Sequence, residues 1–180
     1  LDQQNFTEKF KTSISGTIAD EAGAYLSGVT VNANGQKTTT DGNGYFRILN
    51  VPVAENIVVN YGKDGYFDGA ITQFSKSGKP FNLQLILSKK TDILTFSTST
   101  GGKLEFGSIA TVNFSPNSMV TSSGTSYYGT VKAAIKYIDP NRELGARQMP
   151  GGFTGVNSKG ETSGFLSYGV IGVDLQGANG

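Results

Sequence analysis

The chain contains no cysteine, no histidine and no tryptophan among its 180 residues. The absence of cysteine excludes disulfides, thiolate nucleophiles and most structural zinc sites. The absence of histidine excludes Ser-His-Asp triads, histidine-ligated zinc peptidases and acid–base catalysis by imidazole.

Charged side chains are also scarce, at 16% of the chain against about 25% in typical soluble proteins. The net charge is +1, without a basic block or an acidic tail, so we expect neither nucleic acid nor an anionic membrane as a partner. No apolar run approaches the roughly 18 residues of a membrane span. Leu1-Asp2-Gln3-Gln4 does not resemble a signal peptide, so we expect any such segment to be removed or to lie outside this chain.

Several catalytic motifs are missing as well. The sequence contains no S-x-x-K, no G-x-G-x-x-G and no G-x-x-x-x-G-K pattern. A glycosidase needs two carboxylates across a sugar cleft, and Asp64 and Asp68 are a pair near each other in sequence. Their ordinary interpretation is two loop carboxylates that solvate a turn, so we expect a protein without catalytic activity.

Glycine, in contrast, is abundant, with 25 of 180 residues, about twice the usual 7%. This composition is typical of many short strands joined by tight turns. The strongest turn signal is Asp41-Gly42-Asn43-Gly44, which lies between two β-type runs, Gln36–Thr40 and Tyr45–Leu49. Asp, Asn and Gly all tolerate turn conformations, so this stretch predicts a β-hairpin.

Alternating apolar residues predict half-buried strands along most of the chain. In the first half, the residues that share an inward face are Ile14 and Ile18; Val29, Val31 and Ala33; Ile57, Val59 and Tyr61; and Phe81, Leu83, Leu85 and Leu87. In the second half they are Ala110, Val112 and Phe114; Val131, Ala133, Ile135 and Tyr137; and Gly169, Ile171, Val173 and Leu175. Residues 149–164 are predicted to form a long glycine-rich loop.

The same pattern predicts two domains. Residues 1–12 are polar and aperiodic, which indicates a flexible lead-in, and residues 13–88 form the first sandwich. Residues 89–92 lack apolar periodicity and are predicted to be a linker. Residues 93–180 form a second sandwich, truncated at its C-terminus, because Gln176–Gly180 is typical of a hairpin turn with no strand after it.

Four ordered motifs of the first half resemble the carboxypeptidase regulatory-like family. They are Ile14-Ser15-Gly16-Thr17-Ile18-Ala19-Asp20, Leu26-Ser27-Gly28-Val29-Thr30-Val31, Thr40-Asp41-Gly42-Asn43-Gly44-Tyr45-Phe46 and Gly62-Lys63-Asp64-Gly65-Tyr66. The resemblance implies a seven-stranded, transthyretin-like (prealbumin-like) sandwich without catalytic activity. It also implies a secreted or surface-attached bacterial protein.

The second half resembles another module. Gly101-Gly102-Lys103-Leu104, Tyr128-Gly129-Thr130-Val131, Tyr137-Ile138-Asp139-Pro140 and Met149-Pro150-Gly151-Gly152-Phe153 are similar to the β-sandwich that follows a regulatory-like domain. That arrangement occurs in bacterial surface proteins and in cartilage intermediate layer protein. The resemblance brings no catalytic role with it.

Two further chemistries stay open as alternatives. Asp41 and Asn43 have the spacing that begins an EF-hand, but Pro52 stands where the bidentate Glu belongs, so a calcium site would need Asp64 or Glu55 as a further ligand. The ordinary interpretation of this stretch is turn chemistry. Lys11 and Asn82 are the pair placed for an isopeptide bond between the first and last strands, which would require a buried lysine.

Exposed aromatic residues are the candidates for ligand contact. Aromatic residues on strands are expected to be buried. Tyr127 and Tyr128 follow a polar loop and point to opposite faces, so one of them is expected to be exposed. Tyr25 and Phe153 also lie in predicted loops.

The sequence therefore predicts an all-β protein of two tandem β-sandwich domains, without enzymatic activity, at the bacterial cell surface or secreted. Attachment to the outer membrane and a periplasmic location are the alternatives. The predicted role is structural, as a spacer, or adhesive, with an extracellular protein or a polysaccharide as partner. The alternative role is that of a carbohydrate-binding accessory module in a polysaccharide-uptake system. No cofactor is predicted, with calcium as the alternative above.

Overall fold

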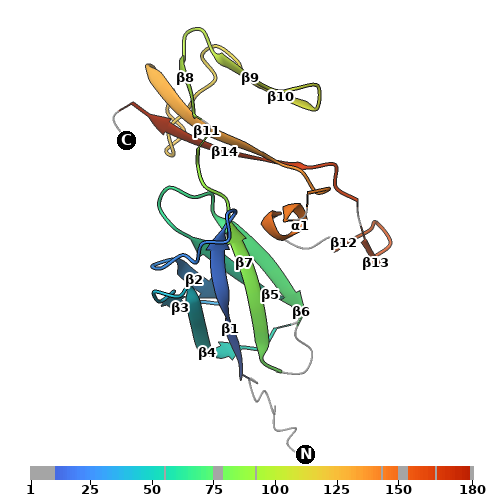
Figure 1. Cartoon of the computed structure of the whole chain (residues 1–180). Helices are drawn as coiled ribbons and strands as arrows, with labels where there is room; N and C mark the ends of the chain where they lie inside the picture. The colour runs from blue at the N-terminus through green and yellow to red at the C-terminus, as the bar shows by residue number, and fades with distance from the viewer. Residues whose placement is uncertain are drawn as a thin grey trace, which may run out of the picture. The chain divides into compact units, whose positions relative to one another are not determined.

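A computed structural model describes residues 11–54, 56–74, 79–91, 93–142, 144–149, 154–164 and 166–178. The predicted all-β fold is confirmed, since the regular structure of these residues consists of strands and one four-residue helix (Figure 1). The chain divides into two compact units. Unit 1 comprises residues 1–89 and 140–167, and unit 2 comprises residues 90–139 and 168–180. The domain boundary at residues 89–92 stays a prediction.

The first seven strands form the sandwich of unit 1. They are β1 (Lys11–Asp20), β2 (Thr30–Ala33), β3 (Gln36–Thr39), β4 (Tyr45–Pro52), β5 (Asn56–Gly62), β6 (Gly69–Phe74) and β7 (Phe81–Leu87). One sheet has the order β4-β1-β7 and the other has the order β3-β2-β5-β6. β1 is antiparallel to β4 and parallel to β7, whereas every neighbouring pair in the second sheet is antiparallel. Seven strands in two sheets are what the family resemblance implies.

The core between the two sheets follows the predicted alternation. The inward side chains that are fully buried include Ile14, Ile18, Val29, Val31, Ala33, Ile57 and Val59, and Leu83, Leu85 and Leu87 are nearly so. Ile86 is an exception, because it points away from this core and is nevertheless buried. The predicted lead-in ends earlier than expected, since Thr12 already pairs with Val51 inside the sheet.

The predicted hairpin at residues 41–44 is wrong. The turn exists, because Gly44 N–H donates to Asp41 O at 3.0 Å and Asp41 N–H donates to Tyr45 O at 2.9 Å. However, β3 and β4 belong to different sheets, so the chain crosses from one layer of the sandwich to the other at this turn.

Thr40 explains why the two strands separate. Its side chain is buried, and its hydroxyl accepts a hydrogen bond from Val29 N at 2.9 Å and donates one to Leu26 O at 2.6 Å. The end of β3 is thereby bound to the segment before β2, whereas Tyr45 on the other side of the turn pairs with Thr17 of β1. The turn residues specify a reversal of the chain, and the neighbouring side chains select the partner strand.

Residues 149–164 are not the uninterrupted loop that the glycine content predicts. They include a small hairpin of β12 (Thr154–Val156) and β13 (Thr162–Gly164), whose turn is closed by Asn157 N–H donating to Glu161 O at 2.9 Å. The helix α1 (Gly145–Gln148) precedes it and packs against β7. Both elements are too short to produce a periodic pattern.

Unit 2 contains a three-stranded sheet and a two-stranded hairpin. Its strands are β8 (Ile93–Ser97), β9 (Gly102–Phe106), β10 (Ala110–Phe114), β11 (Thr130–Ile138) and β14 (Val170–Gly177). The sheet has the order β14-β11-β8, and β9 and β10 pair with each other. Phe96 of β8 stacks on Phe114 of β10 with ring centroids 4.9 Å apart, so hairpin and sheet share a small core.

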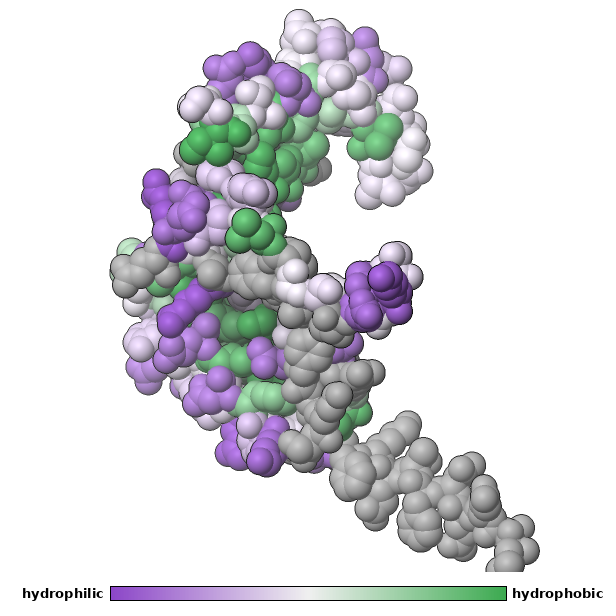
Figure 2. All heavy atoms as spheres, turned by 90° about the vertical axis from the view of Figure 1, so that its right-hand side faces the viewer, coloured by the Kyte–Doolittle hydropathy of each residue, from purple (hydrophilic) through white to green (hydrophobic). Residues whose placement is uncertain are grey.

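The inner face of this sheet is only partly covered. Val173 and Leu175 of β14 lie opposite Ile135 and Ala133 and therefore share their face, yet both are more than two fifths exposed. A two-stranded hairpin is narrower than a three-stranded sheet, so the edge strand keeps apolar surface in contact with water. Figure 2 shows apolar side chains reaching the surface between polar ones.

Backbones approach each other closely at Gly16 in the middle of β1. A Cβ atom on Gly16 would collide with the carbonyl group of Leu83 and would reach 3.0 Å from the ring of Phe46. Gly16 also pairs with Phe46 of β4 on one side and Leu83 of β7 on the other. Glycine is therefore the residue that fits at this position without a collision.

We expect Gly16→Ala to destabilise the chain by about 1–3 kcal/mol, because the extra methyl group overpacks the sheet centre. The matched control is Gly42→Ala at an exposed turn, where a Cβ atom would meet no atom within 4 Å. Its effect should stay within about 0.5 kcal/mol. Urea unfolding followed by circular dichroism measures both, and equal stabilities for the two variants would contradict the packing argument.

Candidate binding face

The structure describes three of the four aromatic candidates. Tyr25 is 62% exposed and Tyr128 is 74% exposed, whereas Tyr127 is half-buried. The prediction that one of the two adjacent tyrosines is exposed is thus confirmed. Phe153 lies outside the described residues.

Tyr127 has a structural role in unit 2. Its ring packs against the core that contains Phe96, and its hydroxyl donates to Thr130 O at 3.1 Å. The same oxygen accepts a hydrogen bond from Ala178 N at 3.3 Å. Tyr127 thereby holds the end of β14 next to the start of β11, and it offers no free ring to a ligand.

Tyr25 lies on the outer face of the β4-β1-β7 sheet, beside a second tyrosine. It forms an antiparallel bridge with Ala19, while Tyr45 pairs with Thr17, so both side chains share the outward face of β1. Both also lie on the β4 side of β1, because Ile18 N–H donates to Gly44 O and Ile18 O accepts from Leu26 N, each at 2.9 Å. Thr17 and Ala19 are two residues apart, which places the tyrosine backbones about 7 Å from each other.

Tyr45 was not predicted as a candidate, because aromatic residues on strands are expected to be buried. It is 43% exposed. The available signal is its neighbour Phe46, since adjacent strand residues point to opposite faces and Phe46 is in the core. Neither tyrosine ring stacks on another aromatic ring among the described residues.

The segment that carries Tyr25 is held by polar contacts from several elements. Asp20 Oδ1 accepts hydrogen bonds from Ala22 N and Ala24 N at 2.9 Å each. Lys63 Nζ donates to Ser27 O at 2.8 Å, and the Thr40 hydroxyl donates to Leu26 O. Because its backbone is fixed on both sides, Tyr25 is presented from a constrained segment.

The rest of this outer face is mostly polar, and its charged side chains are cationic. β1 contributes only small side chains beyond Lys11, β4 adds Arg47 and Leu49, and β7 adds Asn82 and Gln84. Their register is given by three cross-strand rows: Tyr45, Thr17 and Gln84; Arg47, Ser15 and Asn82; and Ala19 with Ile86. α1 packs against β7 and Ile86 is buried, whereas Asn82 and Gln84 are exposed, so the open part of the face lies over β1, β4 and the first half of β7.

The carboxylate of Asp41, which the calcium alternative would use, makes hydrogen bonds within its own turn. Asp41 Oδ1 accepts hydrogen bonds from Asn43 N and Tyr45 N at 2.9 Å each, which is the turn chemistry expected of it. No cluster of three acidic side chains that could hold a metal is found in the part of the chain that the structure describes. Glu55 lies outside that part, and Asp64 and Asp68 are both exposed.

The isopeptide hypothesis is wrong. Lys11 and Asn82 are both exposed, whereas the reaction requires a buried lysine. Asn82 also pairs with Ser15, four residues along β1 from Lys11.

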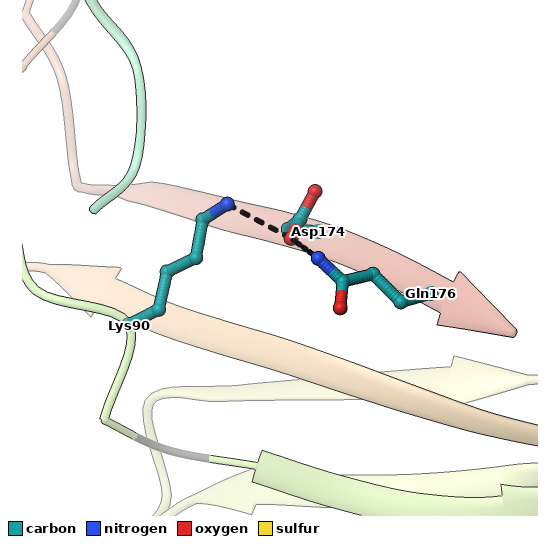
Figure 3. Close-up of polar contacts among 3 residues, drawn as sticks. All are labelled: Lys90, Asp174 and Gln176. Atoms are coloured by element: carbon teal, nitrogen blue, oxygen red, sulfur yellow. Dashed lines mark hydrogen bonds and ion pairs between the residues drawn. The ribbon is translucent and has the colours of Figure 1, made fainter. Parts of the chain in front are cut away.

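In unit 2, an ion pair and a further polar contact lie next to β14. Lys90 Nζ donates to Asp174 Oδ2 at 2.9 Å, and Gln176 Nε2 contacts the same oxygen at 3.5 Å (Figure 3). Both charged side chains are partly exposed, so this pair contributes at most about 1 kcal/mol. It ties the segment before β8 to β14.

Tyr61 is a buried titratable side chain with a shifted pKa. Burial raises the pKa of Tyr61 to about 12, because the phenolate would be removed from water. Its ring lies over Gly69, its partner across β5 and β6, where a Cβ atom would collide with it. Its hydroxyl therefore stays protonated at neutral pH, and the side chain contributes to the packing of the core.

The fold and the face together define a class: an all-β sandwich module that presents an open, aromatic and polar sheet surface. The model of the family "Carboxypeptidase regulatory-like domain" matches residues 13–88. The match covers the residues of the four motifs and confirms the resemblance that they predict. No curated protein matches the chain. No helix among the described residues is long and apolar enough to cross a membrane.

Solved structures resemble the chain only weakly. One belongs to a type II cohesin–X–dockerin complex from Acetivibrio cellulolyticus (24% identity, TM-score 0.37, 43% of this chain and 58% of that one). Another is 3-chlorocatechol 1,2-dioxygenase from Rhodococcus opacus (14%, 0.37, 44% and 59%). A third is a Bacteroides uniformis protein suggested to bind carbohydrate (12%, 0.34, 94% and 80%). The chain spans less than three fifths of the first two, and likenesses this weak carry no argument about function.

Alkaline titration tests the environment of Tyr61. The folded state keeps its proton up to about pH 12, whereas an unfolded tyrosine loses it near pH 10. The stabilisation from this group is therefore complete below pH 10 and is lost as the pH rises to 12, by about 2–3 kcal/mol in total. Urea unfolding across this range should show a shallower pH dependence for Tyr61→Phe than for the unaltered chain. Parallel curves would mean that the hydroxyl is solvated in the folded state.

Proposed function

We propose that the chain is a non-catalytic pair of modules with a structural, spacer or adhesion role at the surface of a bacterial cell or in secreted form. The observation that carries this proposal is the chemistry of the interior. Among the described residues, Tyr61 alone combines an ionisable side chain with burial, and the cores of both units are otherwise apolar. A rigid sandwich of this kind suits the presentation of surfaces and offers no buried acid or base for catalysis.

The second candidate function is that of a carbohydrate-binding accessory module in a polysaccharide-uptake system. The specific observation in its favour is that Tyr25 and Tyr45 share one outward face of unit 1. Two exposed rings at neighbouring positions on a sheet form a platform that a spacer does not require.

Labelling of intact cells tests the proposed location. A membrane-impermeant amine reagent should modify exposed lysines such as Lys37 on intact cells of the source organism, as it does after lysis. A cytoplasmic protein serves as the control and should be labelled only in lysates. Labelling of this chain only after lysis, or release of reducing ends from any polysaccharide by the purified chain, would contradict the proposal.

A further inference from the structure

The outer face of the β4-β1-β7 sheet combines a bulky row with a strip of small side chains. Tyr25, Tyr45, Arg47 and Leu49 follow one another along its β4 edge at intervals of about 7 Å, and all four are exposed. The neighbouring outward positions of β1 carry only Ser13, Ser15, Thr17 and Ala19. Beyond this strip, Asn82 and Gln84 of β7 present two exposed amides.

This combination matches the chemistry of a sugar chain. A pyranose ring presents an apolar C–H face, which packs on a tyrosine ring, and hydroxyl groups at its edge, which bond to amides and alcohols. The buried core of a protein interface is more apolar than its rim, whereas the strip beside this row carries the hydroxyl groups of Ser13, Ser15 and Thr17. A nucleic acid would require several basic groups, and the open face provides one arginine between the tyrosines and Leu49.

The charge on the face selects among sugars. The charged residues at outward positions of its three strands are Arg47 and Lys11, and both are cationic. Three carboxylates lie near the tyrosines in the chain. Asp20 and Asp41 each have one oxygen engaged by two backbone N–H groups, and Glu21 Oε2 accepts a hydrogen bond from Lys89 N at 3.3 Å. A guanidinium fork binds a carboxylate through two parallel hydrogen bonds, so a sugar that carries a carboxylate is the complementary unit.

We propose that this face binds an acidic polysaccharide, a chain of uronic-acid units lying along β1. Its rings pack on Tyr25 and Tyr45, a carboxylate meets Arg47, and hydroxyl groups reach Gln84 and Asn82. The inference rests on the proposed non-catalytic, extracellular role, and no bond is made or broken in it.

The face is largely preorganised for such a ligand. Tyr45 and Arg47 belong to a strand paired along its length with β1, and Tyr25 comes from a segment fixed by Asp20, Thr40 and Lys63. Little backbone order therefore has to be gained on binding, which reduces its entropic cost.

Titration calorimetry of the full chain with oligogalacturonate and with alginate oligomers tests the proposal. The matched ligand control is the same oligomer with its carboxylates reduced to alcohols. Tyr25→Ala and Tyr45→Ala should each weaken binding of the acidic oligomer about tenfold or more, because each removes a stacking surface. Arg47→Gln should weaken it to the level of the reduced oligomer.

Tyr128→Ala is the matched protein control, since it removes a more exposed tyrosine ring from unit 2 and should leave affinity unchanged. Thermal melts establish that each variant is folded, and the exposed positions make this the expected result. The proposal is overturned by a lack of binding to both acidic oligomers, by affinities that the Tyr25 and Tyr45 variants do not alter, or by equal binding of the reduced oligomer. If intact cells are labelled but the chain binds neither acidic oligomer, this inference is refuted and the proposed function stands. If labelling occurs only in lysates, the proposed function is refuted whatever the affinity for the oligomers.

Discussion

In unit 1, β1 lies between β4 and β7. At Gly16 the neighbouring strands approach β1 so closely that the glycine hydrogen fits and a Cβ atom does not. The ring of Phe46 covers this position from β4, and the carbonyl group of Leu83 approaches it from β7. A shift of either neighbour by one residue would place a side chain there or turn the apolar set outward. The contact therefore specifies the register of the whole three-stranded sheet.

The same register creates the outer face. Strand residues alternate between two faces, so the pairing that buries Ile18 and Phe46 also aligns Thr17 with Tyr45 on the opposite side. Tyr45 is thus positioned by the packing on the opposite side of the sheet, and Tyr25 by its bridge to Ala19 of the same β1. The register of β1 and β4 thus determines both the buried core and the outer face. The outer face therefore has a defined geometry, although its residues come from separate strands.

The order of residue types along the chain predicts well which side chains are buried, and predicts poorly which strands pair with each other. The alternation around Ile14, Val31 and Leu85 was sufficient to identify strands and their inward residues, because it depends only on local spacing. The partner of β4 depends on the buried hydroxyl of Thr40 and on β1, both beyond the turn that suggested a hairpin. Tyr25 lies beside Tyr45 because Tyr25 bridges to Ala19 of β1, next to the position where Tyr45 pairs with Thr17. The residues around either tyrosine do not indicate this arrangement. The three-residue strands β12 and β13 are too short for a period to be recognised.

The turn at residues 41–44 also has a consequence for how unit 1 assembles. It divides the chain into β1–β3 and β4–β7, and each of the two sheets takes strands from both parts. Neither sheet can be completed from one side of the turn, and the parallel pair β1 and β7 joins the first strand to the last. Chain closure over such separations has to occur before most contacts form, which places folding among the slower, non-local topologies. A backbone cut at this exposed turn would leave two fragments that can rebuild the sandwich only by recombining.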